Sequence, residues 1–214
     1  MKTILFQGDS ITDCGWDRNN SSSLGQGYAQ LVAAELGFEF PGEYTFYNRG
    51  ISGNRIVDLY ARIKADIINL RPDYMSILIG VNDVWHEIMR NNGVDAEKFE
   101  KIYSMLLEEI LQALPDLKLL LIAPYVVKGS STDNTADDPT RFQVFREEVD
   151  KRIAAVEKIG KKFHLPVLYL QEKFDEHIAQ NNNASYWVRD GVHPTLYGHE
   201  LIAREWLGAF RALC

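Results

Sequence analysis

Short apolar runs alternate along this chain with longer segments whose apolar residues recur at helical spacing. The short runs lack polar–apolar alternation, which is typical of strands covered by helices on both faces. They are Thr3–Gln7, Thr45–Asn48, Met75–Ile79, Leu119–Ala123 and Val167–Tyr169. A repeated strand–helix alternation predicts a parallel sheet with helices on both of its faces, an α/β fold.

The segments between and after these runs predict helices. They are Tyr28–Leu36, Val57–Leu70, Ala96–Leu114, Arg141–Phe163 and Thr195–Leu213. Gly37 follows the first of them and indicates its C-terminal end. No linker or internal repeat divides the 214 residues, so a single domain is expected over residues 1–214. The polar stretch Gly129–Thr140 predicts a surface loop or flap.

Composition excludes several classes of protein. The formal net charge of -7 opposes a nucleic-acid binder, which would carry a basic surface. No run approaches the ~18 apolar residues of a membrane span, and the first apolar run is shorter than the roughly 7–15 residues of a signal peptide's core. Cys14 and Cys214 are too few for a disulfide framework, so we expect free thiols and a cytoplasmic protein.

Small and polar residues come directly after the predicted strands. In parallel sheets, ligands bind beyond the carboxyl ends of the strands, so these residues mark a candidate site. They lie in Gly8-Asp9-Ser10, Asn48–Asn54, Gly80–Asp83, Ala123–Tyr125 and, before the last helix, Asp190–Pro194. Their convergence on one edge is the strongest functional signal of the sequence.

Ser10 and His193 have the residue types of a nucleophile and its base. A serine hydroxyl needs a base to take its proton, and a carboxylate usually orients that base. Asp190 lies three residues before His193, and Pro194 fixes the turn. Taken alone, Gly-Asp-Ser is more often an ordinary turn and Asp-x-x-His a surface capping pair. Their joint occurrence in the order Ser, Asp, His favours a catalytic triad.

Three groups could donate hydrogen bonds to a developing oxyanion: the backbone N–H of Ser10, that of Gly53, and the side-chain amide of Asn82. A plain turn at Gly53 and a helix N-cap at Asn82 are the structural alternatives. His193 and His199 lack metal-ligand spacing and a third ligand, so neither a metal nor a cofactor is expected.

Four blocks of the sequence together resemble the SGNH hydrolases, also called GDSL esterases and lipases. The blocks are Gly8-Asp9-Ser10-Ile11, Gly53, Gly80-x-Asn82-Asp83 and Asp190-x-x-His193-Pro194. The resemblance implies a three-layer α/β/α sandwich with a flavodoxin-like five-stranded parallel sheet. It also implies that Ser10 is the nucleophile, His193 the general base and Asp190 its orienting acid. Ser10, Gly53 and Asn82 would form the oxyanion hole.

Longer stretches around these blocks resemble the carbohydrate-esterase branch of the family, in particular bacterial acetyl xylan esterases of the SGNH type. They are Gly8–Gly15, Arg49–Leu59, Leu78–Trp85 and Asp190–His199. This implies an esterase that removes acetyl groups from short xylo-oligosaccharides. The alternatives are a broader short-chain ester or thioester hydrolase, a lysophospholipase, and a non-catalytic flavodoxin-like module that binds a ligand. Asp9, Trp85, Tyr125 and Trp187 are the candidate substrate-binding residues, although both tryptophans could equally be core aromatics. The sequence leaves homo-oligomerisation open, with Gly129–Thr140 as a candidate contact.

Overall fold

The computed structural model describes residues 1–213, and Cys214 lies outside the described residues. Five parallel strands form one sheet over residues 1–213, in the order β2-β1-β3-β4-β5. The strands are β1 (Lys2–Gly8), β2 (Tyr44–Asn48), β3 (Tyr74–Leu78), β4 (Lys118–Ala123) and β5 (Val167–Tyr169). Their pairing starts from Lys2 opposite Tyr44 and from Ile4 opposite Tyr74. The predicted flavodoxin-like parallel sheet is confirmed.

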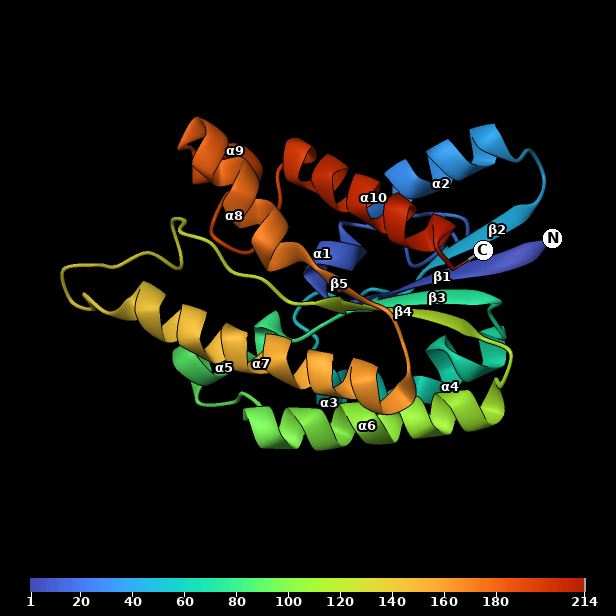
Figure 1. Cartoon of the computed structure of the whole chain (residues 1–214), viewed down its shortest axis with the longest axis horizontal. Helices are drawn as coiled ribbons and strands as arrows, with labels where there is room; N and C mark the ends of the chain where they lie inside the picture. Colours follow the sequence, from blue (N-terminus) through green and yellow to red (C-terminus); the bar gives the residue numbers. More distant parts are fainter. Residues whose placement is uncertain (214) are drawn as a thin grey trace.

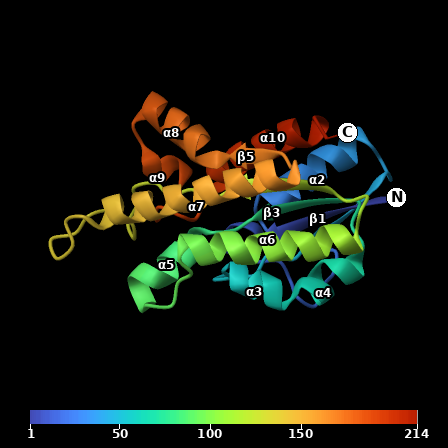
Figure 2. The same ribbon diagram turned by 60° about the horizontal axis from the view of Figure 1, so that its bottom comes forward.

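Helices cover both faces of the sheet (Figure 1). On one side lie α2 (Tyr28–Glu39), α8 (Leu170–Asn181) and α10 (Leu196–Arg211). On the other lie α3 (Ile56–Ala61), α4 (Ile63–Asp66), α6 (Ala96–Ala113) and α7 (Arg141–Phe163). Figure 2 shows the second layer from below, with α6 and α7 side by side. The remaining short elements are α1 (Ser10–Asp13), α5 (Val81–Arg90), α9 (Ala184–Trp187) and a 3₁₀ turn, Ile68–Leu70.

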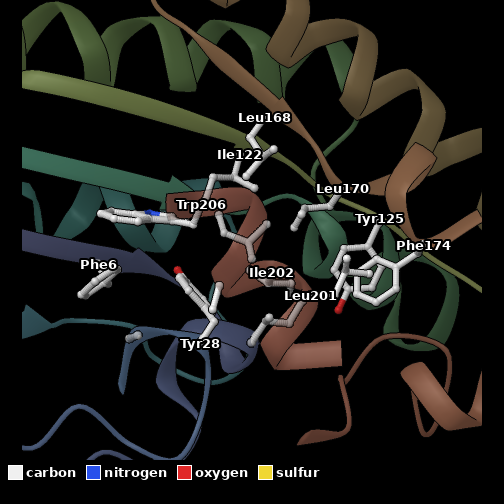
Figure 3. Close-up of a cluster of buried hydrophobic side chains, with 14 of the residues drawn as sticks. Phe6, Tyr28, Ile122, Tyr125, Leu168, Leu170, Phe174, Leu201, Ile202 and Trp206 are labelled. Atoms are coloured by element: carbon white, nitrogen blue, oxygen red, sulfur yellow. The ribbon is translucent and has the colours of Figure 1, made fainter. Parts of the chain in front are cut away.

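Two apolar cores lie between these layers, and the alternation along each strand divides residues between them. In β1, Ile4 and Phe6 face the core beneath α2 and α10, while Leu5 faces the core beneath α3 and α6. Figure 3 shows part of the first core, where Trp206 of α10 packs beside Phe6. Because both faces of β1, β3 and β4 are buried, these strands have apolar sequences without polar–apolar alternation.

Two expectations about helices need correction, and α8 was not predicted. The segment predicted as one helix over Val57–Leu70 is interrupted at Arg62, whose φ of -111° and ψ of 14° are not helical. Its guanidinium donates hydrogen bonds to side chains of Gln7 and Asn54, contacts that compete with a continuous helix. Gly37 does not end α2, which continues to Glu39. The helical periodicity of the sequence did not lead to a prediction of α8.

Candidate active site

Ser10 is the first residue of α1, directly after the carboxyl end of β1. Asp9 caps this short helix, because its Oδ1 accepts the backbone N–H of Ile11 at 3.0 Å. The chain therefore turns sharply from a buried strand into a helical turn, and the Ser10 side chain emerges at the sheet edge. Ser10 Oγ lies 2.8 Å from Nε2 of His193, within hydrogen-bond distance.

Asp190 and His193 lie on the loop that precedes α10. Oδ2 of Asp190 lies 2.6 Å from Nδ1 of His193, and Oδ1 accepts the backbone N–H of His193 at 2.8 Å. Between them Gly191 has φ +100°, and a Cβ there would lie 1.9 Å from Oγ1 of Thr132. Glycine thus permits the tight turn that aims the imidazole at Ser10.

The electrostatics of this pair favour a carboxylate beside an imidazole. Burial alone would raise the pKa of Asp190, but hydrogen bonds from the side chain and backbone of His193 outweigh it and lower that pKa. The hydrogen bond with Asp190 is the main reason that the pKa of His193 is raised, and partial burial opposes it. Because Asp190 is ionised, Nδ1 of His193 keeps a proton and Nε2 faces Ser10.

Three potential donors meet beside Ser10. Neither the backbone N–H of Ser10 nor that of Gly53 donates a hydrogen bond to any group in residues 1–213. Asn82 lies in the first turn of α5, whose N-cap is Gly80, so the N-cap alternative for Asn82 is wrong. One Nδ2 hydrogen of Asn82 is directed to the carbonyl of Asn54 at 3.2 Å, which leaves the other for a ligand.

Buried polar side chains hold the Ser10 turn and the Gly53 loop together. Oδ2 of Asp13 accepts both the backbone N–H and the hydroxyl of Ser52, each at 2.9 Å, and Arg18 pairs with the same oxygen. Asn48 is fully buried, donates to the carbonyl of Thr12 at 2.6 Å and accepts from the N–H of Gly50 at 2.8 Å. Sequence reasoning missed both Asp13 and Asn48 as positioning residues. A polar residue that closes an apolar strand was the available signal for Asn48.

An open cleft of about 640 Å³ contains Ser10 and His193. It is lined by Ser10, Ser52, Gly53, Asn54, Arg55, Asp58, Asn82, Trp85, His86, Arg90, Asn92, Val192 and His193. Trp85, a candidate substrate-binding residue, therefore lies in the cleft, with its ring 5.4 Å from that of Phe145. The cleft has room for a ligand of several rings, which exceeds what a simple acetate ester needs.

The other three candidate substrate-binding residues lie elsewhere. Tyr125 is fully buried, and its ring stacks on that of Phe174 with centroids 4.3 Å apart (Figure 3). Its hydroxyl donates to the carbonyl of Val192 and so supports the His193 loop. Trp187 packs against the ring of His177 and not in the cleft. Asp9 is also fully buried, and its Oδ2 has no hydrogen-bond partner. Its burial raises the pKa of Asp9 to about 7.

Metal binding finds no support in the described part of the chain. Within residues 1–213, no group of three or more His, Cys, Asp or Glu side chains is arranged to hold a metal ion. His199 is buried and accepts the backbone N–H of Tyr28 on Nδ1 at 3.2 Å. None of the helices in the described range has the length and apolar character to cross a membrane.

A hydroxyl, an imidazole and a carboxylate in one hydrogen-bonded series, beside free N–H donors, form an arrangement that acyl-transferring hydrolases use. The model of the GDSL-like lipase/acylhydrolase family matches residues 6–201. The chain belongs to this family and is a carboxylic ester hydrolase with the three-layer α/β/α fold.

Several individual proteins are similar to this chain over nearly its whole length. The chain is 32% identical to an acetylxylan esterase from Geobacillus stearothermophilus, over 95% of this chain and 91% of that protein. The crystal structure of the acetylxylan esterase Axe2 from the same organism superposes with a TM-score of 0.80 at 30% identity, covering 97% of this chain and 93% of the other. A protein from Parabacteroides merdae designated a GDSL-like lipase gives a TM-score of 0.90 at 34% identity, covering 100% and 96%.

Proposed function

We propose that this protein is a serine esterase that removes short acyl groups, acetyl foremost, from acylated carbohydrates such as xylo-oligosaccharides. The observation that carries the proposal is the hydrogen-bonded series from Ser10 through His193 to Asp190, with separations of 2.8 and 2.6 Å. The similarity to acetylxylan esterases supports the choice of acyl group and of sugar. The open, polar cleft supports a sugar more than a long acyl chain.

In the proposed mechanism, Oγ of Ser10 attacks the ester carbonyl while Nε2 of His193 takes the hydroxyl proton. Negative charge develops on the carbonyl oxygen and accepts hydrogen bonds from the N–H groups of Ser10 and Gly53 and from Asn82. Asp190 holds the imidazole in the required tautomer and stabilises its charged form.

Collapse of the tetrahedral intermediate breaks the bond between the carbonyl carbon and the alcohol oxygen. His193 gives its proton to that oxygen, and the sugar leaves with a free hydroxyl. A water molecule, deprotonated by the same imidazole, then attacks the acyl group on Ser10. Acetate departs, and the proton returns to Ser10.

The first experiment measures hydrolysis of aryl acetate, butyrate and octanoate by the wild type and by Ser10→Ala. We expect a preference for acetate and the loss of nearly all activity in the variant. Acetate release from acetylated xylo-oligosaccharides then tests the sugar. A preference for octanoate would instead favour the lysophospholipase alternative, and full activity in Ser10→Ala would refute the serine mechanism.

A further inference from the structure

One face of α5 carries a row of side chains along the cleft. Asn82, His86 and Arg90 are spaced four residues apart, so they succeed one another on the same side of the helix, and all three line the cleft. The His86 ring lies beside the Gly53 loop, since a Cβ built on Gly53 would lie 3.9 Å from Nε2 of His86. Eight residues of helix place the Cα of Arg90 about 12 Å further along the axis than that of Asn82.

Two guanidinium groups line this end of the cleft, and only one of them is neutralised. Nε and Nη2 of Arg55 pair with Asp58 at 3.0 and 3.2 Å, and its Nη1 donates to the carbonyl of Asn92 at 2.7 Å. The side chain of Arg90 is exposed and makes no hydrogen bond or ion pair with any residue in 1–213. The cleft lining thus holds one uncompensated positive charge, in a chain whose formal net charge is -7.

The charges of the two arginines also affect the pKa of His86. Burial, followed by the charges of Arg90 and Arg55, lowers the pKa of His86, while Asp58 opposes them. The lowered pKa favours a neutral imidazole at His86, which lies between Arg90 and Gly53. A neutral imidazole can donate a hydrogen bond to a hydroxyl group or accept one from it. The row runs from an oxyanion donor, through a neutral polar group, to a free cation.

We propose that Arg90 is a specificity residue for a carboxylate carried by the alcohol portion of the ester, so that the preferred substrates are acylated sugars with an acidic sugar unit. This inference rests on the proposed function. If the acyl group is acetyl, its two carbons are too short to reach along the ~12 Å of α5 between Asn82 and Arg90, so the anion has to belong to the alcohol. Arginine suits the task because its planar fork can bind a carboxylate through two hydrogen bonds.

The test compares two acetylated xylo-oligosaccharides, one bearing a uronic acid and the other the same compound with that carboxyl reduced to an alcohol. Acetate release is measured with the wild type, Arg90→Gln, Arg90→Lys and Arg204→Gln. Arg204 is exposed, pairs with Glu200 on α10 and lies outside the cleft. Arg204→Gln therefore removes the same positive charge as Arg90→Gln without changing the cleft and serves as the control. A small neutral ester, phenyl acetate, reports on the Ser10 chemistry in every variant.

We expect the wild type to prefer the acidic compound, and Arg90→Gln to lower kcat/KM for it about three- to tenfold through KM. Arg90→Lys should keep part of the preference, Arg204→Gln all of it, and 0.5 M salt should reduce it. Phenyl acetate should be cleaved equally by all four proteins.

Equal kcat/KM for the two sugars, or an equal effect of Arg90→Gln and Arg204→Gln, would overturn the role of Arg90 while leaving the proposed function intact. If phenyl acetate is cleaved and neither sugar is, the sugar substrate is wrong and the inference falls with it. A preference for an aryl hemisuccinate over the aryl acetate would move the anion to the acyl side and would also overturn it.

Discussion

Asp9, the residue before Ser10, is a fully buried carboxyl group, and we expect its burial to affect stability. Its Oδ1 accepts the N–H of Ile11, whereas Oδ2 has no partner and is free to carry a proton. Loss of solvent is the largest cause that raises its pKa from 3.8 to about 7. Between these two pKa values, the folded protein binds a proton that the unfolded chain releases.

The sign of the effect comes from proton linkage. Because the folded state holds the extra proton, the free energy of unfolding falls as pH rises from 3.8 to 7 and is level above that range. A shift of about 3 pH units corresponds to about 4 kcal/mol in total. From pH 5 to pH 8, the range that is convenient to measure, Asp9 should account for a fall of about 2–3 kcal/mol in the free energy of unfolding.

The perturbation is Asp9→Asn, which keeps the cap on Ile11 and removes the titrating group. Urea unfolding is monitored by tryptophan fluorescence at several pH values for both proteins. The unpartnered amide of the variant costs about 1–3 kcal/mol at every pH, so the test is the pH dependence of the difference. The free energy of unfolding of the variant should rise by about 2–3 kcal/mol relative to that of the wild type between pH 5 and pH 8. Asp137→Asn, at an exposed carboxyl, is the control. A difference that does not change with pH would refute the reasoning.

Other predictions concern the site itself. Asn82→Ala should unfold like the wild type and lower kcat about 10²–10³-fold; an unchanged kcat would remove Asn82 from the oxyanion hole. Asp190→Asn should lower kcat by up to about 10⁴-fold. Wild-type activity should rise with pH as His193 loses its proton, and any residual activity of Asp190→Asn should extend to lower pH, because the main cause of the raised pKa of His193 is gone. Asn48→Leu should cost about 3 kcal/mol in urea unfolding, since it leaves buried backbone groups without partners; a loss under 1 kcal/mol would contradict this.

The strands and the Ser10 and His193 neighbourhood were predictable from sequence for the same physical reason. A strand covered on both faces has to be apolar throughout, so the residue at which polarity begins marks the sheet edge. Gly8 and Leu78 are paired at the ends of β1 and β3, so the polar residues after both strands lie at one edge. Parallel topology then brings together residues that are far apart in the sequence.

The direction of individual side chains was not predictable by that reasoning. Tyr125 comes after β4 at the expected edge, yet its ring enters the core and stacks on Phe174. The break in the helix at Arg62 could not be predicted either. The guanidinium of Arg62 donates to the carbonyl of Arg49 and to the side-chain amide oxygen of Gln7, and a helical pattern of apolar residues contains no information about these acceptors. Tertiary hydrogen bonds of this kind cannot be predicted from the local spacing of apolar residues.

The helix that carries Ser10 depends on its surroundings for its shape. Four residues are too few to form a stable helix alone, since nucleation costs more than one turn of hydrogen bonds returns. Asn48 binds the end of this turn from β2, and Asp13 links it to the Gly53 loop. The hydroxyl of Ser10 and the backbone N–H of Gly53, the nucleophile and one oxyanion donor of the proposed mechanism, are therefore fixed through the same buried contacts. Their relative position is set by the packing of β1 against β2 and does not depend on either loop alone.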